Sequence, residues 1–142
     1  MGAKTSVAQR PATHEDANLL LRLYEVRREK KMRAARTWFM KHFHAGTVEE
    51  FEKLCPLGSE ENAFYRMVVS YWEMAASFVT EGILHQKLFT QNSRELLFVW
   101  ERIRDVVPAL RAKFQNSNLA SNLETVANAM LADRLPDSAF GV

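Results

Sequence analysis

Apolar side chains recur every three or four residues along most of the chain, a spacing that places them on one face of an α-helix. The first such pattern runs from His14 to Ala45, between Thr13 as a candidate N-cap and Gly46, which favours a helix end. A helix over this range would be roughly 48 Å long at about 1.5 Å per residue. Because a compact domain of 142 residues needs less, we expect part of this helix to overhang.

Capping residues and prolines divide the remaining chain into further helices. Thr47 and Glu50 form a capping box before a short helix, and Ser59 is the N-cap of the next one. Pro108 predicts a kink or restart, and Pro136 predicts a helix end. The later helices are expected at residues 60–81, 84–89, 93–107 and 119–134.

The helix expected at residues 60–81 is apolar around most of its circumference, so we place it at the centre of the fold. No segment alternates between apolar and polar residues as a half-buried strand does. The pattern predicts an all-α protein, an antiparallel bundle of about four main helices with short linking helices and an overlong first helix. We expect one domain at residues 13–136, between a disordered tail at 1–12 and a C-terminal tail at 137–142.

Composition agrees with an ordinary globular domain, since 47% of the residues are hydrophobic and 25% are charged. No apolar run approaches the roughly 20 residues that span a bilayer, and the first residues lack the apolar core of a signal peptide. Cys55 is the single cysteine, so no disulfide can form within the chain. These features predict a cytoplasmic protein without a transmembrane segment. Gly2 and Ser6 fit a myristoylation pattern, but an ordinary tail is the favoured interpretation.

Charge is distributed unevenly along the chain. Residues 1–46 hold ten basic and four acidic side chains, a net charge of +6, whereas residues 47–82 hold two basic and seven acidic ones, a net charge of −5. Opposite charges of this kind favour contact between the two segments, within one chain or between two copies.

The densest basic stretch covers residues 27–36, and its six bases would point in all directions around a helix. It is a candidate anion-binding site, because such bases release counterions when they contact phosphate. We favour instead a solvated stretch of the overhanging helix, since no nucleic-acid-binding motif accompanies it. The candidate anion-binding residues are Arg27, Arg28, Lys30, Lys31, Arg33 and Arg36.

The sequence offers little catalytic chemistry. It contains no Glu-x-x-His spacing for a helical metal site, and His42 and His44 would lie about 200° apart on a helix. Cys55 with either histidine is the only conceivable nucleophile and base, and a buried thiol is the more common role for such a cysteine. We therefore expect no enzyme activity, no metal and no cofactor.

Glu73 is the only charged residue between Arg66 and Glu81 on the helix expected to be central. A carboxylate without a partner is costly to bury. We therefore expect Glu73 to form a structural ion pair with an arginine of a neighbouring helix, namely Arg36, Arg102, Arg104 or Arg111.

Several packing motifs follow one another in a characteristic order. They are Ala35-Arg36-Thr37-Trp38-Phe39, Tyr71-Trp72-Glu73, Glu81-Gly82-Ile83-Leu84, and Trp100 followed by Pro108-Ala109-Leu110-Arg111. In this order the chain resembles an uncharacterised all-helical bacterial domain-of-unknown-function family over about residues 20–132. The resemblance implies helical topology only.

These observations favour a non-enzymatic helical interaction module that self-associates through its long first helix. Its expected partner is a second copy or another protein. The alternative is a peripheral anion binder that uses residues 27–36 on nucleic acid or acidic lipid. Nucleic acid or an acidic membrane surface is the less favoured partner.

Overall fold

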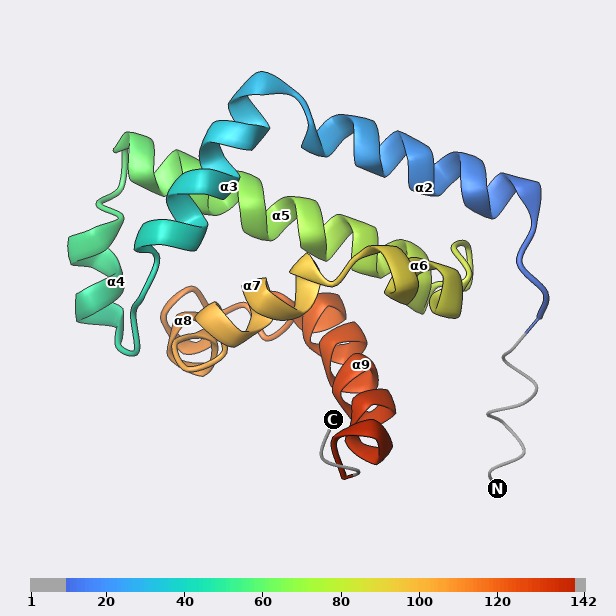
Figure 1. The fold of residues 1–142 in the computed structure, drawn as a ribbon. Coiled ribbons are helices and arrows are strands. Elements are labelled where there is room, and N and C mark those ends of the chain that lie inside the picture. The colour runs from blue at the N-terminus through green and yellow to red at the C-terminus, as the bar shows by residue number, and fades with distance from the viewer. Residues whose placement is uncertain (1–9, 140–142) are drawn as a thin grey trace.

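The structure, a computed structural model, describes residues 10–139, with side chains described up to residue 133. Within this range the chain forms helices and no strand, which confirms the predicted all-α class (Figure 1). Residues 1–9, which include Gly2 and most of the expected N-terminal tail, and residues 140–142 lie outside the described residues. No helix of the described part has the length and apolar character required to cross a membrane.

Eight helices are described, and short loops connect them. They are α2 (His14–Arg27), α3 (Lys30–His42), α4 (Val48–Leu54), α5 (Glu60–Thr80), α6 (Gln86–Asn92), α7 (Glu95–Ile103), α8 (Val107–Lys113) and α9 (Ser121–Ala139). Thr13, Thr47 and Ser59 each accept a hydrogen bond from the backbone N–H three residues later, as their N-cap positions predict. Gly82 ends the turn after α5 with a φ of +79°, a backbone conformation that favours glycine.

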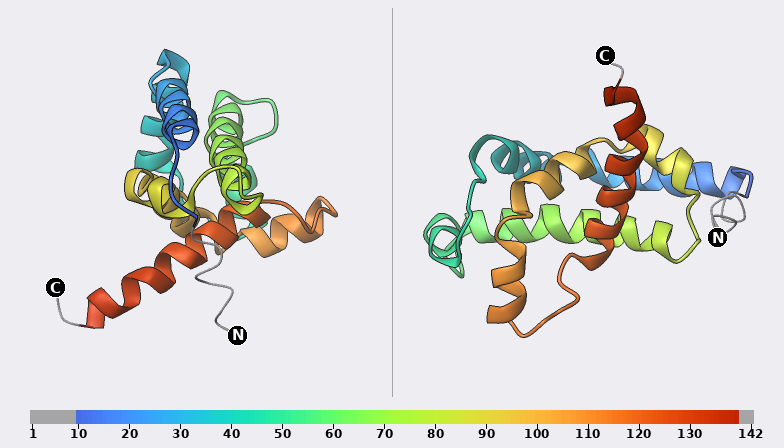
Figure 2. Two further views of the ribbon diagram at one scale, coloured as in Figure 1. Left: turned by 90° about the vertical axis from the view of Figure 1, so that its right-hand side faces the viewer. Right: turned by 90° about the horizontal axis from the view of Figure 1, so that it is seen from below.

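Helix α5 lies at the centre of the molecule, as its nearly continuous apolar surface predicts. It packs mainly against α3 on one side and α9 on the other, and α9 crosses it rather than running alongside (Figures 1 and 2). Nine of the 21 residues of α5 are buried, and the Trp72 side chain is only 1% exposed. The aromatic side chains of α3 and α4 extend this core, with the Phe39 and Phe43 rings stacked at 4.8 Å between centroids.

The prediction of one overlong first helix is wrong, because α2 ends at Arg27 and α3 begins at Lys30. Glu29 has an extended backbone, and its carboxylate accepts a hydrogen bond from the Met32 N–H at 3.1 Å, so it is the N-cap of α3. The corner lets both halves lie on the core, through Leu23 on α2 and Phe39 on α3. Helical spacing continues through the corner, and Glu is not a typical N-cap, so the sequence gives little signal for this break.

The C-terminal half also differs from its predicted boundaries. The helix expected at residues 93–107 ends at Ile103, and Pro108 lies in the first turn of α8, where a missing N–H costs nothing. The last helix, expected to stop before Pro136, continues to Ala139. A proline removes one backbone donor but does not forbid the helix that surrounds it.

Candidate functional site

The six bases of residues 27–36 lie around the corner between α2 and α3, and the structure gives them different roles. Arg33 donates from Nε to the Arg28 carbonyl at 2.9 Å, and Arg36 donates from Nη1 to the Arg27 carbonyl at 3.2 Å. These arginines therefore satisfy carbonyl groups at the C-terminal end of α2, which have no partner inside that helix. Arg28 donates to the Tyr24 hydroxyl at 2.8 Å.

Arg36 and Arg27 share a single carboxylate, that of Glu95 at the start of α7. Arg36 binds it with both Nε and Nη2, at 2.9 and 2.8 Å. The nearest Arg27 nitrogen is 3.9 Å away from the same carboxylate. The pairing raises the pKa of Arg36, through the hydrogen bonds to Glu95 against the opposing effect of burial. Two guanidinium groups and one carboxylate leave this cluster with one uncompensated positive charge.

The Arg27 side chain lies between aromatic rings rather than in solvent. Its guanidinium carbon is 5.3 Å from the centroid of the Trp72 ring and 5.4 Å from that of Tyr24, and the side chain is 15% exposed. Cations are attracted to the faces of such rings, with tryptophan the strongest. Arg27, which the sequence assigned to a solvated stretch, is thus part of the packed interior.

Lys30 and Lys31 are exposed at the start of α3. An open hollow of about 580 Å³ runs along the outer side of α3, between Lys30, Arg33, Trp38 and Lys41. Basic side chains and one half-buried indole ring therefore share this surface. Of the predicted anion-binding residues, the structure places only Lys30 and Arg33 on it.

Comparison with known proteins gives a family without an assigned activity. Residues 12–130 match the family described as domain of unknown function (DUF4760). The chain belongs to this family. The predicted resemblance to an uncharacterised family is thereby confirmed. No curated protein and no solved structure matches the chain, so any function must be argued from the site itself.

Glu73 of this DUF4760 domain pairs with none of the arginines whose side chains the structure describes, so the predicted ion pair with Arg36, Arg102, Arg104 or Arg111 is wrong. One carboxylate oxygen accepts hydrogen bonds from the Asn122 backbone N–H at 3.2 Å and side-chain amide at 2.8 Å, and the other from the Leu123 N–H at 2.8 Å. Glu73 thus caps the N-terminal end of α9, where unpaired N–H groups and the helix dipole favour a negative charge.

Three of the four arginines predicted as partners of Glu73 contact other groups, and the fourth is exposed. Arg36 pairs with Glu95, and Arg111 pairs with Glu124 at 2.8 Å. Arg102 donates to the Met40 carbonyl at 2.7 Å, near the C-terminal end of α3. Arg104 is exposed. Sequence spacing could not show that the first turn of α9 would bring backbone N–H groups to Glu73.

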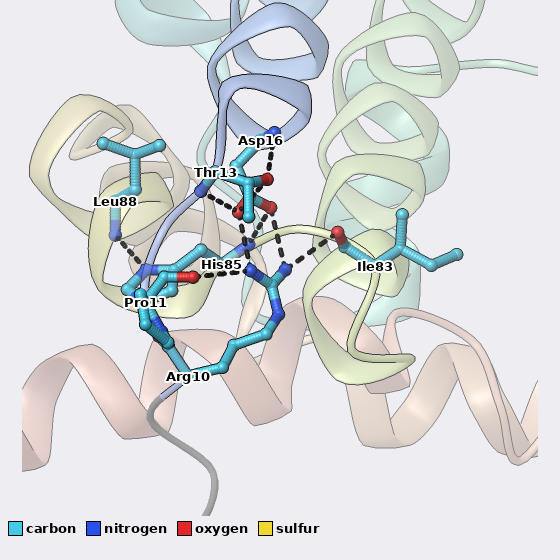
Figure 3. Close-up of polar contacts among 7 residues, drawn as sticks. All are labelled: Arg10, Pro11, Thr13, Asp16, Ile83, His85 and Leu88. Atoms are coloured by element: carbon cyan, nitrogen blue, oxygen red, sulfur yellow. Dashed lines mark hydrogen bonds and ion pairs between the residues drawn. The ribbon is translucent and has the colours of Figure 1, made fainter.

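Asp16, whose carboxylate is buried, fixes the N-terminal segment of the DUF4760 domain (Figure 3). It accepts hydrogen bonds from the Arg10 guanidinium at 2.7 and 2.8 Å, from the Thr13 N–H and hydroxyl, and from the His85 N–H. The hydrogen bonds from Arg10, above all, hold the pKa of Asp16 well below its usual range. Arg10, which the sequence predicts to be in the tail, therefore ties that segment to the loop between α5 and α6.

The ring of His85 completes the same network. Nδ1 accepts a hydrogen bond from the Leu88 N–H at 3.1 Å, and Nε2 lies 2.7 Å from the Arg10 carbonyl oxygen. These partners assign the proton to Nε2, because a carbonyl oxygen can only accept. His85 thus caps α6 and holds Arg10 in place, a function that its sequence position did not suggest.

Cys55 is buried, and burial, followed by the nearby Glu61 charge, raises the pKa of its thiol to about 11. The thiol is therefore protonated at neutral pH, whereas the nucleophilic form is the thiolate. In the part of the chain that the structure describes, no three His, Cys, Asp or Glu side chains gather closely enough to hold a metal ion.

Proposed function

We propose that this domain is a non-enzymatic interaction module that self-associates through a groove between α2 and α5. The observation that carries the proposal is an open hollow of about 660 Å³ whose lining is largely apolar. Its exposed side chains include Val26 on α2 and Met74 on α5, which are 46% and 41% exposed. Contiguous exposed apolar surface of this kind is typical of protein contact sites, and methionine adapts readily to a partner.

Charge favours a second copy as the occupant of this groove. Arg22, Glu25, Val26 and Glu29 follow one another at helical spacing, so they form one stripe of α2 and its C-terminal turn along the groove. If two copies met with these stripes antiparallel about Val26, Arg22 of each would lie near Glu29 of the other. A two-fold contact of this kind uses the same surface twice and closes as a dimer. The overlong helix no longer supports self-association, so the proposal rests on the groove and its charges.

Sedimentation velocity over a range of protein concentrations tests this proposal. We expect the parent protein to shift from one copy toward two as concentration rises. Met74→Glu should remain monomeric, because a charge in the groove would have to lose water on association. Leu57→Glu is the matched control, since Leu57 is 94% exposed and lies outside the groove. A parent protein that is monomeric at every concentration, or a Met74→Glu variant that dimerises like the parent, would refute self-association here.

The outer side of α3 favours a second candidate function, anion binding by Lys30, Arg33 and Lys41. It keeps Lys30 and Arg33 of the predicted stretch at residues 27–36 and adds Lys41 from the same side of α3. Binding of a fluorescent single-stranded oligonucleotide should weaken steeply as salt is raised, and more gently after Lys30→Gln with Lys41→Gln. If the oligonucleotide did not bind even at low salt, anion binding by this surface would be refuted.

A further inference from the structure

A partly open, mainly apolar cavity lies beside α2, on the face of that helix away from the groove. Its volume is about 270 Å³, and residues of α2, α5 and α6 line it. Leu20, Tyr24 and Arg27 line it at helical spacing, whereas Glu25, Val26 and Glu29 face the groove. A dry apolar cavity of about 150 Å³ already accepts benzene, and small-ligand pockets begin near 300 Å³. The cavity therefore has room for a ligand with roughly the volume of nine water molecules, at about 30 Å³ each.

Apolar and polar residues line different parts of this cavity. Leu20, Leu23 and Phe89 provide apolar surface, and both Leu23 and Phe89 are buried. Arg27, Asn92 and Ser93 supply the polar groups, and Ser93 is buried. A few polar groups on an otherwise apolar lining fix the orientation of a ligand that has one polar end.

The Arg27 guanidinium has more hydrogen-bonding capacity than the protein uses. A guanidinium has five N–H donors, yet the only carboxylate near Arg27 in the described part of the chain is 3.9 Å away. Both oxygens of that carboxylate, from Glu95, already accept hydrogen bonds from Arg36. The rings of Tyr24 and Trp72 attract the cation but accept no strong hydrogen bond from it.

No other group at this position supplies the missing negative charge. Tyr71 donates its hydroxyl proton to the Leu23 carbonyl at 2.6 Å and also interacts with the Arg27 guanidinium, but burial raises its pKa to about 12, so the hydroxyl stays neutral. A poorly hydrated positive charge that must share its carboxylate with Arg36 is incompletely compensated, and an anion that binds there would relieve this. Arginine is also the side chain best suited to carboxylates, which it binds with two parallel hydrogen bonds.

We propose that this cavity binds a small amphipathic monocarboxylate, with its carboxylate on Arg27 and its apolar body among Leu20, Leu23 and Phe89. The carboxylate of the ligand neutralises the one positive charge that remains among Arg27, Arg36 and Glu95. Its chain is limited to medium length by the cavity volume of about 270 Å³. The proposed ligand contacts Leu20, Leu23, Arg27 and Phe89 line the cavity and not the groove, although Tyr71 lines both.

Titration calorimetry of the full chain with octanoate, with 1-octanol as the neutral probe, tests the proposal. We expect octanoate to bind the parent protein at least about tenfold more tightly than octanol, because only octanoate gains charged hydrogen bonds. Arg27→Gln should remove this preference, whereas Arg28→Gln should keep it. Arg28 is the matched control because it also lies over Tyr24, at 5.4 Å, but does not line the cavity. Octanoate binding should also raise the melting temperature of the parent and not that of Arg27→Gln.

A cavity-filling variant keeps the test decisive if Arg27→Gln does not fold. Leu20→Phe adds bulk inside the cavity and retains the charge of Arg27, so it should weaken both octanoate and octanol by about tenfold or more. Circular dichroism like that of the parent would show that the variant is folded. The proposal is overturned if octanoate fails to bind the parent, if Arg27→Gln binds it as tightly as the parent does, or if Leu20→Phe does so.

Discussion

Arg27 and Arg36 come from the same short basic stretch as Lys30 and Lys31, yet the structure places the two pairs in opposite environments. The arginines lie inward, around the carboxylate of Glu95 and against aromatic rings. The lysines are exposed at the start of α3. The difference arises at the corner between α2 and α3, which turns part of the stretch toward the core. A single basic stretch can therefore contain both arginines that form ion pairs within the fold and lysines that are exposed to solvent.

The strongest way to test this comparison is to remove the shared carboxylate. Glu95→Gln would leave two guanidinium groups, only 15% and 27% exposed at the side chain, without a counterion. We expect the free energy of unfolding to fall by about 2–3 kcal/mol, less than for a fully buried pair because water still reaches these groups. Urea unfolding measures it, with exposed Glu101→Gln on the same helix as the control. Equal stability of the two variants would place Arg27 and Arg36 with the solvated bases.

The dependence of stability on pH extends the comparison to a second internal ion pair, that of Asp16 with Arg10. The folded-state pKa of Asp16 is lowered, so its contribution to stability is complete above the ordinary aspartate pKa of about 3.9 and is lost as pH falls below it. We expect Asp16→Asn to lose stability at neutral pH and to show a smaller further loss in acid than the parent. Urea unfolding at a series of pH values measures this slope. Parallel curves for the two proteins would contradict the role given to Asp16.

Substitution of Glu73 tests a carboxylate whose partners are two backbone N–H groups and the Asn122 side-chain amide rather than arginines. Glu73→Gln removes the charge of the cap on α9 and replaces one of its two accepting oxygens with an NH2 donor, so we expect a loss of about 1–2 kcal/mol. Thermal unfolding should show it, and Glu81→Gln, at the end of α5 in solvent, should show no loss. If both variants melted like the parent, the cap would contribute nothing measurable.

The smallest effect is expected on the outer side of the corner. Lys30→Gln with Lys31→Gln should change the free energy of unfolding by less than about 0.5 kcal/mol, because both side chains are exposed. A loss close to that of Glu95→Gln, measured by the same urea unfolding, would show that the whole stretch is structural.

Local sequence signals predicted much of the fold but little of the polar network. Thr13, Thr47 and Ser59 mark helix starts through bonds to residues three positions away, so their roles are readable from the sequence. The apolar surface of α5 predicted its central position for a similar reason. The corner at Glu29 was missed because helical spacing continues through it.

The candidate site depends on contacts between residues far apart in the chain. Arg36 and Glu95 are 59 positions apart, and Glu73 and Leu123 are 50 apart. No spacing rule links such pairs, and the formal charges alone made Arg36 look like a partner for Glu73. The sequence identified the basic stretch. Which of its bases face inward and which face solvent depends on the course of the backbone at the corner between α2 and α3.

A double-mutant cycle on Arg36 and Glu95 tests the central claim, that the inward bases are held by a specific internal charge cluster. Urea unfolding of Arg36→Gln, Glu95→Gln and the double variant gives the coupling energy of the pair. Lys113 and Glu52, 3.0 Å apart with side chains 44% and 53% exposed, are the reference pair. We predict a coupling of about 1–2 kcal/mol for Arg36 and Glu95, against at most about 0.5 kcal/mol for the exposed pair. Equal and negligible coupling in both pairs would contradict the account.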